Sequence, residues 1–77
     1  MVIPQFNPAA LRRLREEKNL SVRELSAHLL VYAKEKISGQ TIHSHESGIS
    51  LPNADKLSLY SKFFGKPMEF FFSESPK

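Results

Sequence analysis

The feature that most constrains this chain is a complete capping box formed by Ser21 and Glu24. The Ser21 hydroxyl can accept a hydrogen bond from the Glu24 backbone N–H, while the Glu24 carboxylate reaches back to the Ser21 N–H. Leu20 and Leu25 occupy the two positions of a hydrophobic staple around this box. A helix therefore begins here. Because no Gly, Pro or Asn follows before Lys36, we expect this helix to run for about four turns.

Similar start and stop signals mark four other helices. Asn7 is a good N-cap, and Pro8 suits the first position of a helix. Ser38 caps a third helix, which Gly48 ends. Asn53 caps a fourth helix, and Pro67 opens a last short one. The expected helices cover residues 8–18, 21–36, 39–47, 54–64 and 68–72.

These signals predict an all-α fold of five helices with no strand, in one domain over residues 1–77. Residues 1–6 are expected to form an extended apolar arm and residues 73–77 a frayed tail. Ile42 and His45 share one helix face, with Ile49 a further turn along. The other apolar residues at core spacing are Ala10, Leu11, Leu14, Val22, Leu25, Leu29, Tyr32, Ala33, Leu57, Tyr60, Phe63 and Phe64.

Composition narrows the class of protein. The 77 residues contain no cysteine, which excludes disulfides and thiolate metal sites. No apolar run approaches the ~20 residues of a membrane span, and the N-terminus lacks the layout of a signal peptide. We therefore expect a cytoplasmic protein without membrane contact. The net charge of +3 permits a polyanionic partner without requiring one.

The helix that begins after Ser38 has an unusual polar surface. Short, uncharged donors and acceptors occupy its outward positions, where a surface helix commonly carries Glu and Lys. Such a face suits contact with the hydrogen-bonding edges of base pairs in a major groove. The alternative is a serine-rich surface helix, and these residues alone do not decide between the two. The residues concerned are Gln40, Thr41, His43, Ser44 and Ser47.

An ordered set of residues across nearly the whole chain carries a family resemblance. They are Leu11, Leu14, Arg15, Ser21, Glu24, Leu25, Ser26, Ser38, Thr41, Ile42, Glu46, Gly48, Pro52, Leu57, Phe64, Gly65, Glu69 and Phe72. In this order, the chain resembles the phage repressor/Cro-like (XRE-type) helix-turn-helix family over about residues 8–72. The resemblance implies a five-helix, lambda-repressor-like DNA-binding domain.

Two features depart from the family pattern. Ile37 follows Leu25 by twelve positions, about twice the usual spacing, because the family joins its second and third helices by a tight turn. The helical pattern of residues 30–36 favours a longer second helix, and a wider turn is the alternative. Val22 occupies a position where the family often has a Gln that contacts the DNA backbone, so Arg23 would have to replace that contact.

The resemblance implies that helix 39–47 is the recognition helix and lies in the major groove. The implied base contacts come from Gln40, whose amide can bind adenine in a bidentate manner, and from Thr41, His43 and Ser44. The implied phosphate contacts come from Arg23, Lys36, Ser38, Gly39, Ser47 and Lys56.

The resemblance also pairs Arg15 with Glu46 as a structural ion pair between the first helix and the end of the third. No metal site is expected, because His43 and His45 lie on opposite sides of a helix and no Cys or His-Glu-x-x-His spacing occurs. No cofactor is expected. The serines lack an evident base, so we do not expect an enzyme.

We therefore expect a sequence-specific regulator that binds double-stranded DNA, most simply a repressor acting as a homodimer on a two-fold symmetric operator. The aromatic clusters Phe63-Phe64 and Phe70 to Phe72 exceed what a small core needs, so part of them, with Val2-Ile3, would form the dimer contact. Two alternatives stay open. One is the antitoxin of a toxin–antitoxin pair, and the other is a protein-interaction module that has lost DNA binding.

Overall fold

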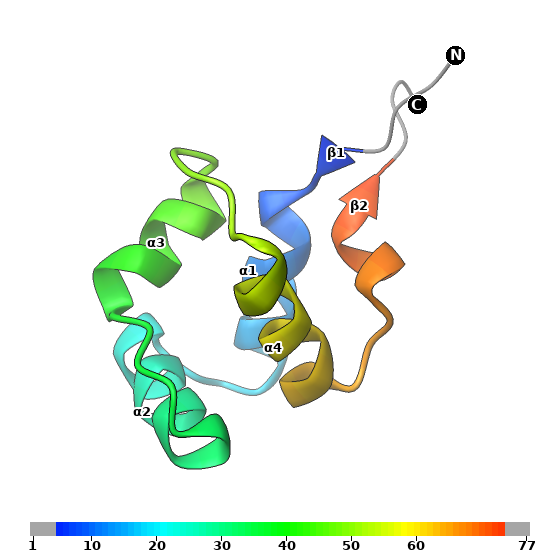
Figure 1. The fold of residues 1–77 in the computed structure, drawn as a ribbon. Coiled ribbons are helices and arrows are strands. Elements are labelled where there is room, and N and C mark those ends of the chain that lie inside the picture. Colours follow the sequence, from blue (N-terminus) through cyan, green and yellow to red (C-terminus); the bar gives the residue numbers. More distant parts are fainter. Residues whose placement is uncertain (1–4, 74–77) are drawn as a thin grey trace.

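The computed structural model describes residues 5–73 and is helical apart from one short ribbon (Figure 1). Four α-helices are followed by a single 3₁₀ turn at the position of the fifth predicted helix. The helices are α1 (Pro8–Glu17), α2 (Val22–Ala33), α3 (Gly39–Ser47) and α4 (Ala54–Phe64), followed by the 3₁₀ turn η1 (Met68–Phe71). The prediction of a helical fold is confirmed, whereas the count of five α-helices is not, because the fifth element is a 3₁₀ turn.

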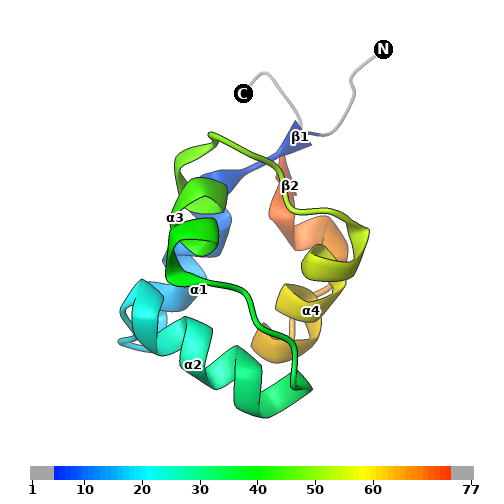
Figure 2. The same ribbon diagram turned by 60° about the vertical axis from the view of Figure 1, so that its left-hand side comes forward.

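The prediction that no strand occurs is also wrong. β1 (Gln5–Phe6) and β2 (Phe72–Ser73) form an antiparallel ribbon that joins the two ends of the described chain (Figures 1 and 2). The Asn7 N–H continues the pairing by donating to the Phe71 carbonyl at 2.7 Å. Two-residue strands are too short for an alternating pattern to reveal. The ribbon places Ser73 in a strand, not in a frayed tail. Residues 1–4 of the predicted arm and 74–77 of the tail lie outside the described residues.

The predicted helix starts are confirmed. Ser21 and Glu24 form both hydrogen bonds of the capping box, at 3.0 and 2.8 Å. Asn7, Ser38 and Asn53 cap α1, α3 and α4 through their side chains. These caps satisfy N–H groups that the first turn of each helix leaves without an internal partner.

The added segment forms one more helical turn followed by a stretch without regular secondary structure, so the prediction that α2 runs to Lys36 is wrong in its last residues. α2 ends at Ala33 because Lys34 adopts the left-handed conformation, with φ of 57°. Ile37 is then buried in the core, and its carbonyl accepts a hydrogen bond from the Ser26 hydroxyl at 2.6 Å. Burial of Ile37 and the extended backbone of the N-cap residue Ser38 are incompatible with a helix that continues through this segment, so they outweigh its helix propensity.

The core lies between the helices, and α3 packs against both α1 and α2 (Figures 1 and 2). Three predicted core residues are instead exposed, namely Tyr32, Ala33 and Ile49. Ile49 follows the left-handed Gly48, where the chain turns away from the helix axis. No helix within residues 5–73 has the length and apolar character needed to cross a membrane. The buried apolar residues are Ala10, Leu11, Leu14, Leu25, Leu29, Ile37, Ile42, Leu57, Leu59, Tyr60, Phe64 and Phe71.

Candidate nucleic-acid interface

α3 begins at a side-chain cap that organises its first turn. The Ser38 hydroxyl accepts a hydrogen bond from the Thr41 N–H at 3.1 Å and donates its own hydrogen to the Thr41 hydroxyl oxygen at 3.0 Å. The N–H groups of Gly39 and Gln40 precede the first internal hydrogen bond of the helix, so they are oriented toward whatever lies beyond its N-terminus. A helix start of this kind favours an anion such as a phosphate.

A groove between α2 and α3 gathers three of the predicted DNA-contacting side chains. Arg23 on α2 and Gln40 and His43 on α3 line it, and all three are exposed. The helices approach closely at Gly39, where an added Cβ would lie 3.8 Å from the Arg23 backbone. That distance is an ordinary van der Waals contact, so the packing of α2 and α3 does not itself require a glycine.

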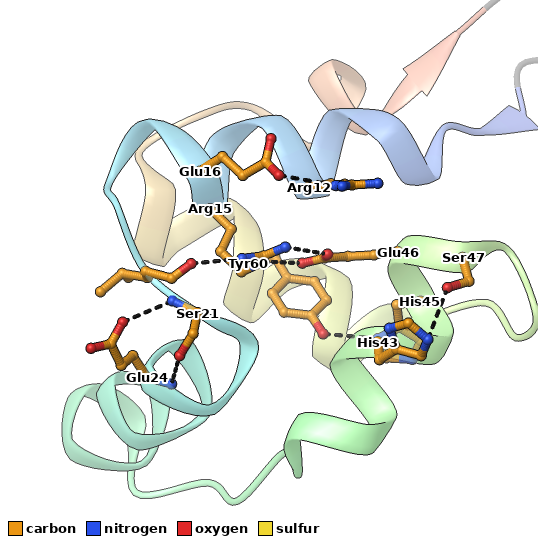
Figure 3. Close-up of polar contacts among 11 residues, drawn as sticks. Arg12, Arg15, Glu16, Ser21, Glu24, His43, His45, Glu46, Ser47 and Tyr60 are labelled. Carbon is orange, nitrogen blue, oxygen red and sulfur yellow. Dashed lines mark hydrogen bonds and ion pairs between the residues drawn. The ribbon is translucent and has the colours of Figure 1, made fainter.

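The polar residues of α3 differ in how far they are exposed. Gln40, His43, Ser44 and Ser47 are spaced to share one helix face. His43 Nε2 lies 3.5 Å from the Ser47 hydroxyl (Figure 3). Ser44 is half-buried, and its carbonyl accepts from the Ile49 N–H at 3.0 Å. Thr41 is half-buried as well, and its hydroxyl is engaged in the cap, so it is oriented for structure more than for base contact.

The predicted phosphate-contacting residues fall in three places. Ser38 and Gly39 are at the start of α3, where Gly39 lies close to Arg23. Lys36 is exposed in the stretch that leads into α3. Ser47 is exposed at the other end of α3, and Lys56 is half-buried in the first turn of α4.

A buried polar pair supports the inner side of α3. His45 is only 3% exposed, and its Nδ1 lies 2.8 Å from the Tyr60 hydroxyl of α4 (Figure 3). Burial lowers the pKa of His45, and the nearby charge of Lys56 lowers it further. Burial also raises the pKa of Tyr60. Both groups are therefore held neutral. The spacing of His45 from Ile42 indicated its face, but nothing local pointed to Tyr60 as its partner.

An ion pair joins the C-terminal part of α3 to α1. Arg15 Nε and Nη2 donate to the two carboxylate oxygens of Glu46 at 2.6 and 2.9 Å, and Nη1 donates to the Leu20 carbonyl at 2.6 Å (Figure 3). The side chains of Arg15 and Glu46 are 13% and 5% exposed. The hydrogen bonds to Glu46 raise the pKa of Arg15. The inner side of α3 is thus anchored by the His45–Tyr60 hydrogen bond and the Arg15–Glu46 ion pair, while its outer face stays exposed.

The other histidine, His28, and most residues of the aromatic clusters pack against neighbouring side chains. His28 is exposed beside the Phe63 ring. Within residues 5–73, no three potential metal ligands gather at one place. Phe64 and Phe71 are buried, and Phe63 and Phe70 are half-buried against the core. Of the aromatic surface expected at a dimer contact, Phe72 alone is exposed, while Val2 and Ile3 lie outside the described residues.

Comparison with known proteins identifies the family. A family model described as helix-turn-helix matches residues 11–71, which include all of α2, α3 and α4. Comparisons with curated proteins and with solved structures gave no match. The matched span covers most of the chain and contains both the open face of α3 and the contacts that hold it. The chain therefore belongs to the Cro/XRE-type helix-turn-helix family, whose members are DNA-binding regulators.

Proposed function

We propose that this protein is a sequence-specific transcriptional regulator that binds double-stranded DNA by inserting α3 into the major groove. One observation carries the proposal. The exposed side chains of Gln40 and His43 lie beside Arg23 at the start of a helix whose opposite side is anchored to the core. Uncharged donors and acceptors suit base edges, and a rigid helix keeps them in register.

In this proposal, Gln40 is the main base-contacting residue, because its amide can bind the N6 and N7 edge of adenine with two hydrogen bonds. His43 and Ser44 contact neighbouring base edges. Thr41 contributes mainly by holding the first turn, since its hydroxyl bonds to Ser38. The contacts to phosphate come from Ser38 and the Gly39 N–H at the helix start, from Ser47 at its end, and from the cations Arg23, Lys36 and Lys56.

The number of cations predicts how affinity depends on salt. Each neutralised phosphate releases condensed counterions and contributes a slope of about −0.9 to log K against log salt. Arg23, Lys36 and Lys56 therefore predict a slope near −3 for each protomer.

We further propose that the protein acts as a homodimer and as a repressor. Two copies would place their recognition helices in successive major grooves, about 34 Å apart, on a two-fold symmetric operator. The repressor role follows the resemblance to phage repressors.

Selection from a randomised duplex library, followed by anisotropy titrations on the enriched site, tests this function. Enrichment of a symmetric site is expected. Gln40→Ala should abolish the preference at one base pair of each half-site, at a cost of about 1–3 kcal/mol. The matched control is Gln5→Ala, since Gln5 is the other glutamine of the chain and is exposed in β1. It should leave the enriched sequence unchanged.

A second pair of variants separates phosphate from base contacts. Lys36→Ala should weaken binding equally for all sequences and reduce the salt slope by about one. Lys66→Ala, at an exposed lysine beyond α4, should change neither. Salt-dependent binding with no enriched sequence would contradict sequence-specific recognition. Absence of binding at low salt would favour the interaction-module hypothesis, and stable capture of a cognate toxin would favour an antitoxin.

A further inference from the structure

The added turn of α2 exposes apolar side chains on the surface of the domain. Val31 is 81% exposed, and its neighbours Leu30 and Tyr32 are also exposed. Ala27 and Val31 lie one turn apart on the same outward face of α2 and are both exposed. Such a face is costly to leave in water, so it is a candidate contact surface.

A shallow hollow accompanies this face. It is lined by Ala27, His28, Val31 and Tyr32 of α2 and by Phe63 of α4. The ring of Tyr32 packs edge-on against the ring of Phe63, with centroids 5.5 Å apart, and the two rings form one side of the hollow. Because Ala27 is small, the side chain of an opposing helix can enter beside it, as a knob enters a hole between packed helices.

The charges at the two ends of this face are opposite. Glu24 lies one turn before Ala27, and Lys34 lies about one turn after Val31, and both are exposed. Glu24 uses one carboxylate oxygen in the capping box and has a second oxygen for another contact. Two copies of α2 can pack antiparallel so that they cross at the level of Leu29, whose own side chain is buried in the core. In this arrangement, Glu24 of each copy faces Lys34 of the other. Ala27 then faces Val31 in the same register.

We propose, building on the homodimer proposed above, that two copies associate through a stripe formed by Glu24, Ala27 and Val31 of α2 together with Lys34, the C-cap residue that follows the helix. Each large side chain meets a small one, and each acid meets a base. Every contact occurs twice, as a two-fold interface requires. The added segment supplies Val31 and Lys34, so the lengthening of α2 completes this stripe.

This arrangement is compatible with DNA binding by both copies. Successive helix residues are about 100° apart around the axis. The stripe is therefore roughly 150° from Val22 and Ser26, which line the groove with α3, and roughly 70° from Arg23. Each α3 would lie on the outer side of the α2 pair, and both Arg23 side chains would face one side. Three helix-to-helix steps of about 8–10 Å separate the two α3 axes by at most about 24–30 Å, which is somewhat shorter than one DNA turn of ~34 Å.

A second exposed apolar surface competes for the same role. Ile49, Leu51 and Phe72 are exposed near a groove between the β-ribbon and the loop before α4. This surface offers apolar area, but none of the residues lining the groove is charged. The α2 stripe is favoured because its charges are self-complementary and specify one register.

Sedimentation equilibrium of the full chain and two matched variants tests the assignment. Val31→Glu places a charge at the centre of the stripe and should raise the dimer dissociation constant about tenfold or more. Ile49→Glu alters a residue of similar exposure on the competing surface and should leave it unchanged. A wild-type chain that stays monomeric at millimolar concentration would overturn the proposal. So would loss of the dimer in Ile49→Glu with retention in Val31→Glu.

A charge test probes the register. Lys34→Glu should weaken the dimer severalfold, because two carboxylates then face each other. Adding Glu24→Gln should recover part of this loss, since glutamine keeps the capping box and removes the repulsion. Equal dimerisation by the single and the double variant would contradict the antiparallel register. Far-UV circular dichroism verifies that each variant is folded.

DNA titration separates this proposal from the function itself. Val31→Glu should bind an isolated half-site as the wild type does and should lose cooperative binding to the full operator. If the wild type dimerises through α2 but binds no DNA, the DNA-binding function fails and the interface stands. If Val31→Glu remains a dimer while binding DNA normally, the interface fails and the function stands.

Discussion

Replacing Arg15 with alanine should strongly destabilise the domain, because it leaves the Glu46 carboxylate without its partner. The Glu46 side chain is 5% exposed, so its carboxylate loses two hydrogen bonds at a site that is shielded from bulk water. The Leu20 carbonyl loses a donor at the same time. We expect α3 to be affected most, since the pair is its polar link to α1.

The size of the effect follows from the burial of the pair. Removing one member of a buried, hydrogen-bonded ion pair costs about 3–5 kcal/mol. A domain of this length has a free energy of unfolding of about 4–12 kcal/mol. At the lower estimate of the cost, the melting temperature falls by roughly 12 °C or more. The variant should therefore fold poorly at physiological temperature and require measurement in the cold.

Urea denaturation followed by far-UV circular dichroism measures the change in free energy of unfolding. The chain provides a matched control in Arg12, which pairs with Glu16 one turn along α1, where both side chains are more than half exposed. Arg12→Ala should cost less than about 0.5 kcal/mol. Arg15→Lys should be intermediate, because an ammonium cannot reproduce the bidentate contact.

The double variant Arg15→Met with Glu46→Leu distinguishes an unpaired charge from lost packing. It should recover most of the stability that Arg15→Ala loses, because apolar side chains of similar size do not carry the desolvation cost. If Arg15→Ala is no more destabilising than Arg12→Ala, then the pair contributes no more than a surface contact and the reasoning is refuted.

Three further predictions concern the support of α3 and its glycines. Because the pKa of His45 is lowered in the folded state, the unfolded chain binds protons first as pH falls, so the free energy of unfolding should decrease from about pH 6.5 downward and be constant above it. Urea titrations from pH 8 to 5 measure this, and an increase on acidification would contradict it. Tyr60→Phe should lower the free energy of unfolding by about 1–3 kcal/mol in the same assay, since the buried His45 Nδ1 loses its hydrogen-bond partner. An unchanged free energy of unfolding would show that this nitrogen finds another hydrogen-bond partner. Gly48→Ala should destabilise the domain by about 1–2 kcal/mol, because the φ of Gly48 is +78°. Gly39→Ala should change the stability by less than about 0.5 kcal/mol, because an added Cβ has ordinary space at Gly39. Equal effects of the two substitutions would refute this contrast.

Local signals predicted most of the helical framework. The caps at Asn7, Ser21, Ser38 and Asn53 act within three residues of each helix start, so the chain needs no distant contact to specify them. The same holds for the left-handed stop at Gly48. The predicted base-contacting positions depended on these boundaries, because the faces of α3 follow once its first residue is known.

Other features could not be predicted because they join residues far apart in the sequence. The ribbon pairs Phe6 with Phe72, and the partner of His45 is Tyr60 on another helix. The end of α2 was placed too late because burial of Ile37 outweighed local helix propensity. The pairing of Arg15 with Glu46 came from the family resemblance, and local spacing contained no sign of it.

Against the spacing of the family that the chain resembles, the sequence revealed an added segment between two helices. By itself, it determined where the helices begin and that Gln40, His43 and Ser47 face outward from α3. These properties depend on hydrogen bonds and periodicity within a few residues. Only the tertiary structure decided that half of the added segment becomes helix, that Arg23 lies beside Gln40 and His43, and that Ala27 and Val31 remain exposed. Those outcomes depend on which side chains the shared core can enclose, and a core is a property of the whole packed chain.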